Sequence, residues 1–219
     1  MLTMDAVVPH GFDETFDLWP ATLADGDPWD ETYLYGGEVV LSGEASDAEV
    51  GTVVVMWAQY RHDERDEAAL RSVWTPHEYL RRALGKEWSP DHVTDGGPRL
   101  RDDDSGVTIA PGCCCGLESW RSWLELLDGG RPVLGHAPVP RVEHDGPLVR
   151  MWPDDRDRTG PSLLLPVADL PGLLRSVHRD LRGFLPLVER WAVGHVPDLA
   201  SALVAEMDAT LRIREPLPW

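Results

Sequence analysis

The strongest pattern in this sequence is an apolar stripe that starts after Asp169 and continues to Trp191. Its members recur at spacings of three and four, as one face of an α-helix requires. Asp169 is a suitable N-cap, Pro186 should kink or break the helix, and Gly194 should end it. A further helix is predicted over Asp198–Leu211, so the C-terminal region 167–212 is helical and needs a layer to pack against. The stripe comprises Leu170, Leu173, Leu174, Val177, Leu181, Phe184, Leu185, Val188 and Trp191.

Two β-type segments could supply that layer. Gly51–Tyr60 contains the continuous apolar run Val53–Ala58, which is typical of a strand buried on both faces. Tyr33–Leu41 is the other segment, and Ser42–Val50 between them has the composition of a hairpin connection. We therefore expect Gly51–Tyr60 to be a central strand.

The middle of the chain alternates between helix and strand signals. Thr75 can cap a helix over Pro76–Leu84 that Gly85 ends. Residues 85–106 are polar and interrupted by glycine and proline, which predicts a long loop. A helix is then expected over Leu117–Leu127, with Leu117, Trp120, Leu124 and Leu127 on one face. Short strands are expected over Val139–Val142 and Leu148–Trp152, and Ser162–Leu165 is a further short apolar run.

This order of elements predicts an α+β fold with an antiparallel or mixed sheet and the C-terminal helices packed on one face. The chain has 219 residues, of which 42% are hydrophobic and 26% charged, so it can bury a substantial core. We expect a single domain over 1–219. Its N-terminal part, 1–32, is acidic and should contain only loops or short elements.

Acidic residues are concentrated at the N-terminal end of the chain. The net charge is −18, and residues 1–60 contain twelve acidic residues and no Lys or Arg. Nucleic acid and anionic membrane surfaces are excluded as partners, because phosphate binding needs clustered cations. A basic protein fits better, with solubility as the competing explanation. The candidate binding residues are Asp13, Glu14, Asp17, Trp19, Asp25, Asp27, Trp29, Asp30 and Glu31.

A second candidate site is the run Cys113, Cys114 and Cys115 ahead of the expected helix. The N-terminus of a helix lowers the pKa of a thiol, whereas the nearby Glu118 opposes ionisation. The cluster is therefore either a nucleophilic or redox-sensing thiol, or a group of small apolar side chains packed in a turn. We expect the second, with at most one thiol reacting quickly at neutral pH.

Neither a metal nor a cofactor is expected. His136 and His144 could join the thiols around zinc, but three adjacent cysteines do not match the ligand spacing of a structural zinc site. The N-terminus lacks the basic and apolar stretches of a signal peptide, and no apolar run is long enough to span a membrane. Clustered cysteines also do not form a secreted disulfide framework, so a cytoplasmic location is expected.

Two short motifs resemble known sequences. The run Pro111–Trp123, PGCCCGLESWRSW, resembles a motif in uncharacterised proteins of high-GC bacteria. Trp120–Gly130 is similar to the L-x-x-F-L-x-x-x-N-G-G stretch of SUKH-type immunity proteins, with Asp128 in place of the usual Asn. This second resemblance implies an acidic α+β protein that binds and neutralises a toxin, often a basic nuclease.

The sequence thus leaves three hypotheses for function. The first is a cytoplasmic acidic binding protein, possibly an immunity-like inhibitor of a basic toxin. The second is a cysteine-dependent enzyme or thiol redox sensor centred on Cys113–Cys115. The third is a structural domain with no catalytic role. No common catalytic motif occurs, which favours a protein that is not an enzyme, and the oligomeric state stays open.

Overall fold

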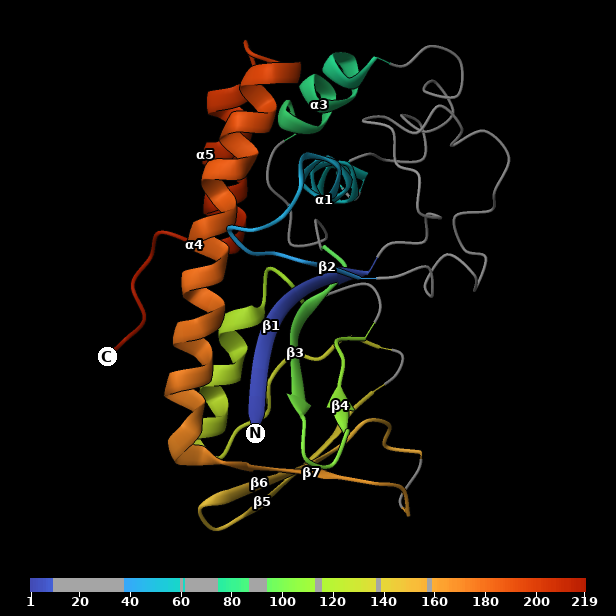
Figure 1. Cartoon of the computed structure of the whole chain (residues 1–219), viewed down its shortest axis with the longest axis vertical. Helices are drawn as coiled ribbons and strands as arrows, with labels where there is room; N and C mark the ends of the chain where they lie inside the picture. Colours follow the sequence, from blue (N-terminus) through green and yellow to red (C-terminus); the bar gives the residue numbers. More distant parts are fainter. Residues whose placement is uncertain are drawn as a thin grey trace.

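Figure 1 shows the computed structural model of the chain. It describes residues 1–9, 38–59, 61, 75–86, 94–112, 116–136, 139–156 and 159–219. Helices occur together with two antiparallel sheets, so the predicted α+β class is confirmed.

The main sheet has four antiparallel strands in the order β2-β1-β3-β4. Their bounds are β1 Leu2–Pro9, β2 Glu38–Val40, β3 Gly97–Asp102 and β4 Thr108–Ile109. Met4, Leu100 and Ile109 lie opposite one another across β1, β3 and β4, and each is at most 2% exposed. This row of buried side chains fixes the register, because a slip of one residue would turn them to the other face.

Two sequence predictions about this sheet are wrong. Residues 1–9 belong to the segment expected to hold only loops or short elements, yet β1 is an inner strand of the sheet. The expected loop 85–106 contains β3, which pairs with β1 along six residues. Gly96 and Gly97 are typical of a loop in sequence. In the structure they adopt positive φ angles at the point where the chain enters β3. Residues 10–32 of the N-terminal segment lie outside the described residues.

The expected central strand over Gly51–Tyr60 is also wrong, because this segment forms helix α1, Asp47–Gln59. Every residue from Val50 to Ala58 is buried, so the apolar run reflects a helix enclosed on all sides. The helix begins with a capping box in which the Ser46 and Glu49 side chains bond each other's backbone N–H groups, at 3.3 and 2.7 Å. The expected hairpin connection over Ser42–Val50 is therefore replaced by a short link and the first turn of α1.

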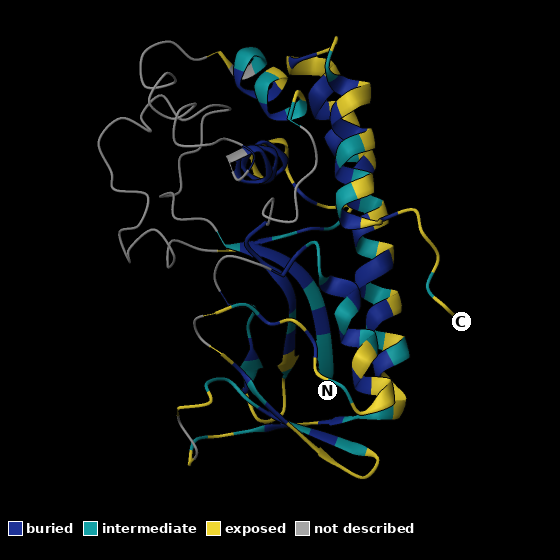
Figure 2. Cartoon of the chain, turned by 180° about the vertical axis from the view of Figure 1, so that it is seen from behind, coloured by how far each residue is buried: buried dark blue, intermediate teal, exposed yellow. Residues whose placement is uncertain are grey.

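The C-terminal helices form the layer that the stripe predicted. Helix α4, Leu170–His195, packs along β1, and both α1 and α5, Ala200–Leu211, pack against α4. Figure 2 shows the buried side of α4 turned toward the sheet. The helix runs through Pro186, so the expected break is wrong. Pro186 is exposed, while Leu185 and Val188 beside it are buried, and their packing holds the helix together.

Helix α3, Pro76–Leu84, confirms its predicted bounds, with the Thr75 hydroxyl accepting from the Glu78 N–H at 3.2 Å. Arg81 and Arg82 both pair with Glu78 and lower the pKa of its carboxyl to about 2. The expected helix after Leu117 is instead the 3₁₀ helix η2, Trp120–Asp128. Its buried apolar side chains are Trp120, Trp123 and Leu126, and Leu117 just before the helix continues the same spacing of three, which matches three residues per turn.

A second sheet lies at the lower end of the molecule in Figure 1. Its strands are β5 Arg141–Asp145, β6 Leu148–Trp152 and β7 Leu163–Pro166, all antiparallel and in that order. β5 and β6 confirm the two strands predicted for this region, within a few residues at each end, and the apolar run Ser162–Leu165 largely coincides with β7. A short 3₁₀ turn, η3 Val167–Asp169, then joins β7 to α4.

Candidate functional site

Both sequence-predicted sites lie outside the described residues. Asp13, Glu14, Asp17, Trp19, Asp25, Asp27, Trp29, Asp30 and Glu31 fall in the undescribed range 10–37, and Cys113, Cys114 and Cys115 fall in 113–115. The structure does describe the residues that flank each range. Those flanking residues show where each segment joins the fold and which charges surround its ends.

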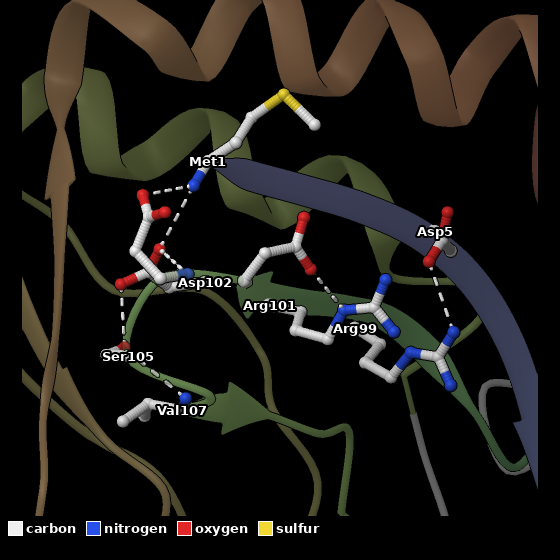
Figure 3. A network of polar contacts seen from close by, with 9 residues as sticks. Met1, Asp5, Arg99, Arg101, Asp102, Ser105 and Val107 are labelled. Carbon is white, nitrogen blue, oxygen red and sulfur yellow. Dashed lines mark hydrogen bonds and ion pairs between the residues drawn. The ribbon is translucent and has the colours of Figure 1, made fainter.

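The two ends of the acidic segment 10–37 are neighbours in the main sheet. Pro9 of β1 pairs directly with Glu38 of β2, and β2 is an edge strand. Arg99 of β3 binds both Glu38 and Asp5, the latter at 3.1 Å. Figure 3 shows the Asp5–Arg99 pair across β1 and β3. The cation at the base of the segment is therefore already matched by two carboxylates.

An open groove of about 550 Å³ lies beside this base, between β1, β2 and α4. At one wall of the groove the segment that follows β2 crosses α4 so closely that the two backbones are in contact. A Cβ on Gly183 of α4 would lie 3.1 Å from the backbone nitrogen of Gly43 in that segment. Arg179 pairs with Asp180 at 3.0 Å, whereas Glu44 forms no ion pair with any described residue. The groove is therefore acidic overall. It is lined by Asp5, Val40, Ser42, Gly43, Glu44, Arg179, Asp180 and Gly183.

The cysteine segment is held at both ends by backbone contacts. The Gly112 N–H donates to the Leu134 carbonyl at 2.7 Å, and the Leu117 N–H donates to the Thr94 carbonyl at 3.4 Å. Gly116 has a φ of 147° and lies so close to Gly96 that a Cβ would be 2.3 Å from the Gly96 oxygen. Only glycine fits this approach, so Gly116 fixes the chain to the start of β3.

Glu118 occupies the N–H groups that could otherwise stabilise a thiolate at this point. Its carboxylate accepts from the Thr94 N–H at 3.0 Å and from the Gly116 N–H, which belongs to the peptide bond after Cys115, at 3.3 Å. Helix η2 begins only at Trp120, so the cysteines do not directly precede a helix as the sequence suggested. Neither these N–H groups nor the start of a helix is therefore available to stabilise a thiolate in this segment.

Thiol titration tests this inference. Iodoacetamide labelling from pH 5 to 9, read for each cysteine by mass spectrometry, should show midpoints no lower than the free-thiol value of about 8.5. Glu118→Gln should lower the midpoint of at least one thiol, because it removes a negative charge beside Cys115. Glu125→Gln, an exposed change of equal charge in η2, serves as the control. A midpoint clearly below 8.5 in the unmodified protein would contradict the structural role.

A buried polar cluster lies beyond the cysteines in the chain and joins η2 to the C-terminal strap, residues 212–216. The Arg121 guanidinium donates to the carbonyls of Arg212, Glu215 and Pro216, at 2.9 Å for Arg212 and 3.2 Å for Pro216. Burial lowers the pKa of Arg121, and the Glu215 carboxylate acts in the opposite direction. Trp120 donates to the Leu211 carbonyl at 2.8 Å, and His178 Nε2 contacts the Ile213 carbonyl at 2.7 Å.

This cluster was missed by the sequence analysis. Arg121 and His178 showed no pattern that tied them to the C-terminus, and Trp120 was expected only as an apolar core residue. These contacts join residues that are distant in the chain. Arg121 and the strap residue Arg212 are 91 positions apart, as are Trp120 and Leu211 at the end of α5. His178 and Ile213 are 35 positions apart. The cluster holds η2 in place but offers no group of acids and bases arranged for catalysis.

No group of three metal-ligating side chains occurs within the part of the chain that the structure describes. His144, one of the two histidines weighed for zinc, places Nε2 2.8 Å from the Gly130 carbonyl on the surface of β5. None of the described helices is long and apolar enough to cross a membrane.

Comparison with known proteins identifies no relative. No protein-family model, curated protein or solved structure matches this chain.

Proposed function

We propose that this chain is a cytoplasmic acidic binding protein that acts as an immunity-like inhibitor of a basic toxin. The observation that carries the proposal is the charge of residues 10–37, which hold seven acidic residues, two tryptophans and no Lys or Arg. Their flanking residues Pro9 and Glu38 are paired in the sheet, beside an acidic groove. A basic surface would be attracted there electrostatically, and tryptophan is a frequent anchor at protein interfaces.

The surroundings of the segment favour a partner from outside over a cation of this chain. Arg99, which lies at the base, is already paired with Asp5 and Glu38. Arg179 in the groove is paired with Asp180. These nearby cations already have carboxylate partners of their own, so cations of a partner protein are better placed to neutralise the acidic segment. The thiol alternative ranks lower, because Glu118 takes up the N–H groups at the end of the cysteine segment.

Association kinetics test the proposal. A basic protein captured from the native host should bind Asp25→Asn/Asp27→Asn/Asp30→Asn roughly tenfold more slowly than the unmodified chain, with a weaker salt dependence. The matched control, Asp128→Asn/Asp145→Asn/Glu189→Gln, removes the same charge at exposed sites elsewhere and should bind normally. Inhibition is tested by expressing the captured protein in host cells with and without this chain. Cells that also express this chain should grow better, because the toxin is inhibited. Equal loss of rate in both triple variants would contradict a specific acidic face.

A further inference from the structure

Five exposed arginines gather where the strap crosses α4. Arg175, Arg179 and Arg182 lie on α4, and Arg212 and Arg214 lie on the strap. The crossing is fixed by the contact between His178 Nε2 and the Ile213 carbonyl at 2.7 Å. Arg175 and Arg182 stand three and four residues from His178 and therefore share its helix face. Arg212 and Arg214 flank Ile213, so we name this set the arginine patch. In Figure 2 the strap and the outward side of α4 are largely exposed.

The arginine patch has more cations than carboxylates. Arg179 pairs with Asp180, Arg212 with Glu215 and Arg214 with Asp208, the last at 3.2 Å. Arg175 and Arg182 form no hydrogen bond or ion pair with any described residue. The two unmatched arginines lie on one side of α4 about two turns apart, and an anionic surface that spans both would be attracted to them. Such a patch is unusual in a protein of net charge −18.

We propose that the arginine patch binds the acidic segment 10–37 of a second copy of this chain. The segment offers seven carboxylates without a cation, and two of the five guanidinium groups lack a partner. Arginine suits this role, since its planar guanidinium binds carboxylates through two parallel hydrogen bonds. The arginine patch and the acidic segment are different surfaces of the chain, so the proposed interface is head-to-tail. One copy can therefore bind a second copy through its patch and a third copy through its acidic segment.

Salt should tune this contact in a defined way. At about 0.15 M ionic strength the screening length is about 8 Å, which suppresses repulsion between the two net charges but preserves contacts between touching groups. At about 1 M it is about 3 Å, and the contact should fail. The proposal uses the same acidic segment as the proposed function, so a basic partner should compete with self-association.

Sedimentation of the full chain tests the proposal. At about 0.15 M NaCl the mean mass should rise above 24.4 kDa as concentration approaches about 1 mM, and return to it at about 1 M NaCl. Arg175→Glu/Arg182→Glu should abolish the rise, and Asp25→Asn/Asp27→Asn/Asp30→Asn should weaken it. The control Arg131→Glu/Arg156→Glu changes net charge equally at exposed arginines outside the patch and should still associate.

Each alternative outcome overturns the proposal. A constant mass of 24.4 kDa at every concentration would exclude a second copy as the occupant. The same result is expected if the acidic segment binds the arginine patch of its own copy, so that case would also overturn the proposal. Equal loss in the control would mean that association depends only on net charge. Loss in the patch variant without any effect of the acidic triple variant would assign the patch another occupant. Absence of a basic partner would refute the proposed function and leave this result unchanged.

Discussion

Gly116→Ala is expected to destabilise the protein by about 4 kcal/mol, through backbone strain and steric overlap together. Gly116 has a φ of 147°, and a Cβ there would lie 2.3 Å from the Gly96 oxygen. The overlap is with backbone, which cannot rotate away as a side chain could. Gly96→Ala should be comparably severe, because its φ is 111° and its Cβ would lie 2.1 Å from the Val7 oxygen. Urea unfolding followed by tryptophan fluorescence measures both losses.

Two further glycines separate the causes. Gly106 has a φ of 72° with nothing within 4 Å of its Cβ position, so alanine there should cost only the strain, about 1 kcal/mol. Gly172 lies in α4 without a neighbour or a positive φ, so alanine should stabilise by about 0.5–1 kcal/mol. A loss at Gly116 no larger than that at Gly106 would contradict the close contact between the cysteine segment and β3.

Arg121→Met is expected to cost about 3 kcal/mol, because it keeps the apolar stem but leaves three carbonyls of the strap without their charged donor. The strap should then detach, and the amides of residues 212–216 should exchange hydrogen faster. Thermal unfolding and hydrogen exchange measure the two effects. Arg214→Met is the control, since its exposed pair with Asp208 should contribute at most about 1 kcal/mol.

A pair of tryptophan variants checks the same strap by a second route. Trp120 and Trp123 are both fully buried in η2, but only Trp120 donates its indole N–H, to the Leu211 carbonyl. The Trp123 N–H has no partner among the described residues. Trp120→Phe should therefore cost more than Trp123→Phe by about 1 kcal/mol, the value of one hydrogen bond. Equal losses would mean that the contact with Leu211 contributes nothing to stability.

The α1 helix shows that a sequence signal can be present and still be missed. Val53–Ala58 fits a buried strand and a buried helix equally well, because neither leaves a polar face. Ser46 and Glu49 have the spacing of a capping box and form one in the structure, but the sequence analysis did not use this signal. A helix cap is a local hydrogen-bond pattern and is visible in sequence, so this error was avoidable.

The strand β3 shows a different limit. Gly96, Gly97 and Pro98 are typical of a loop, and nothing near them in sequence indicates a strand. What makes 97–102 a strand is its pairing with β1, about ninety residues earlier in the chain. Likewise, the spacing of three in η2 depends on Trp123 being buried instead of Leu124, which only packing decides.

For the candidate sites, the sequence identified the acidic segment and the cysteines, but not their surroundings. Glu118 was expected to oppose thiol ionisation, which stays a prediction; the structure shows its two hydrogen bonds, to the Thr94 and Gly116 N–H groups. No sequence pattern indicated that the Thr94 N–H donates to Glu118. The pairing of Arg99 with Asp5 and Glu38 likewise had no sequence signal. Both join residues that are distant in the chain.

By itself, the sequence determined the α+β class, the C-terminal helical layer, the Thr75 cap and the acidic N-terminal charge, all of which follow from local periodicity, capping or composition. Tertiary structure decided the strand order, the path of α4 through Pro186, the close approach of Gly96 and Gly116, and the arginine patch. The physical reason is that these features depend on which distant surfaces bury one another. The free energy of that burial exceeds local preferences such as those of proline and glycine.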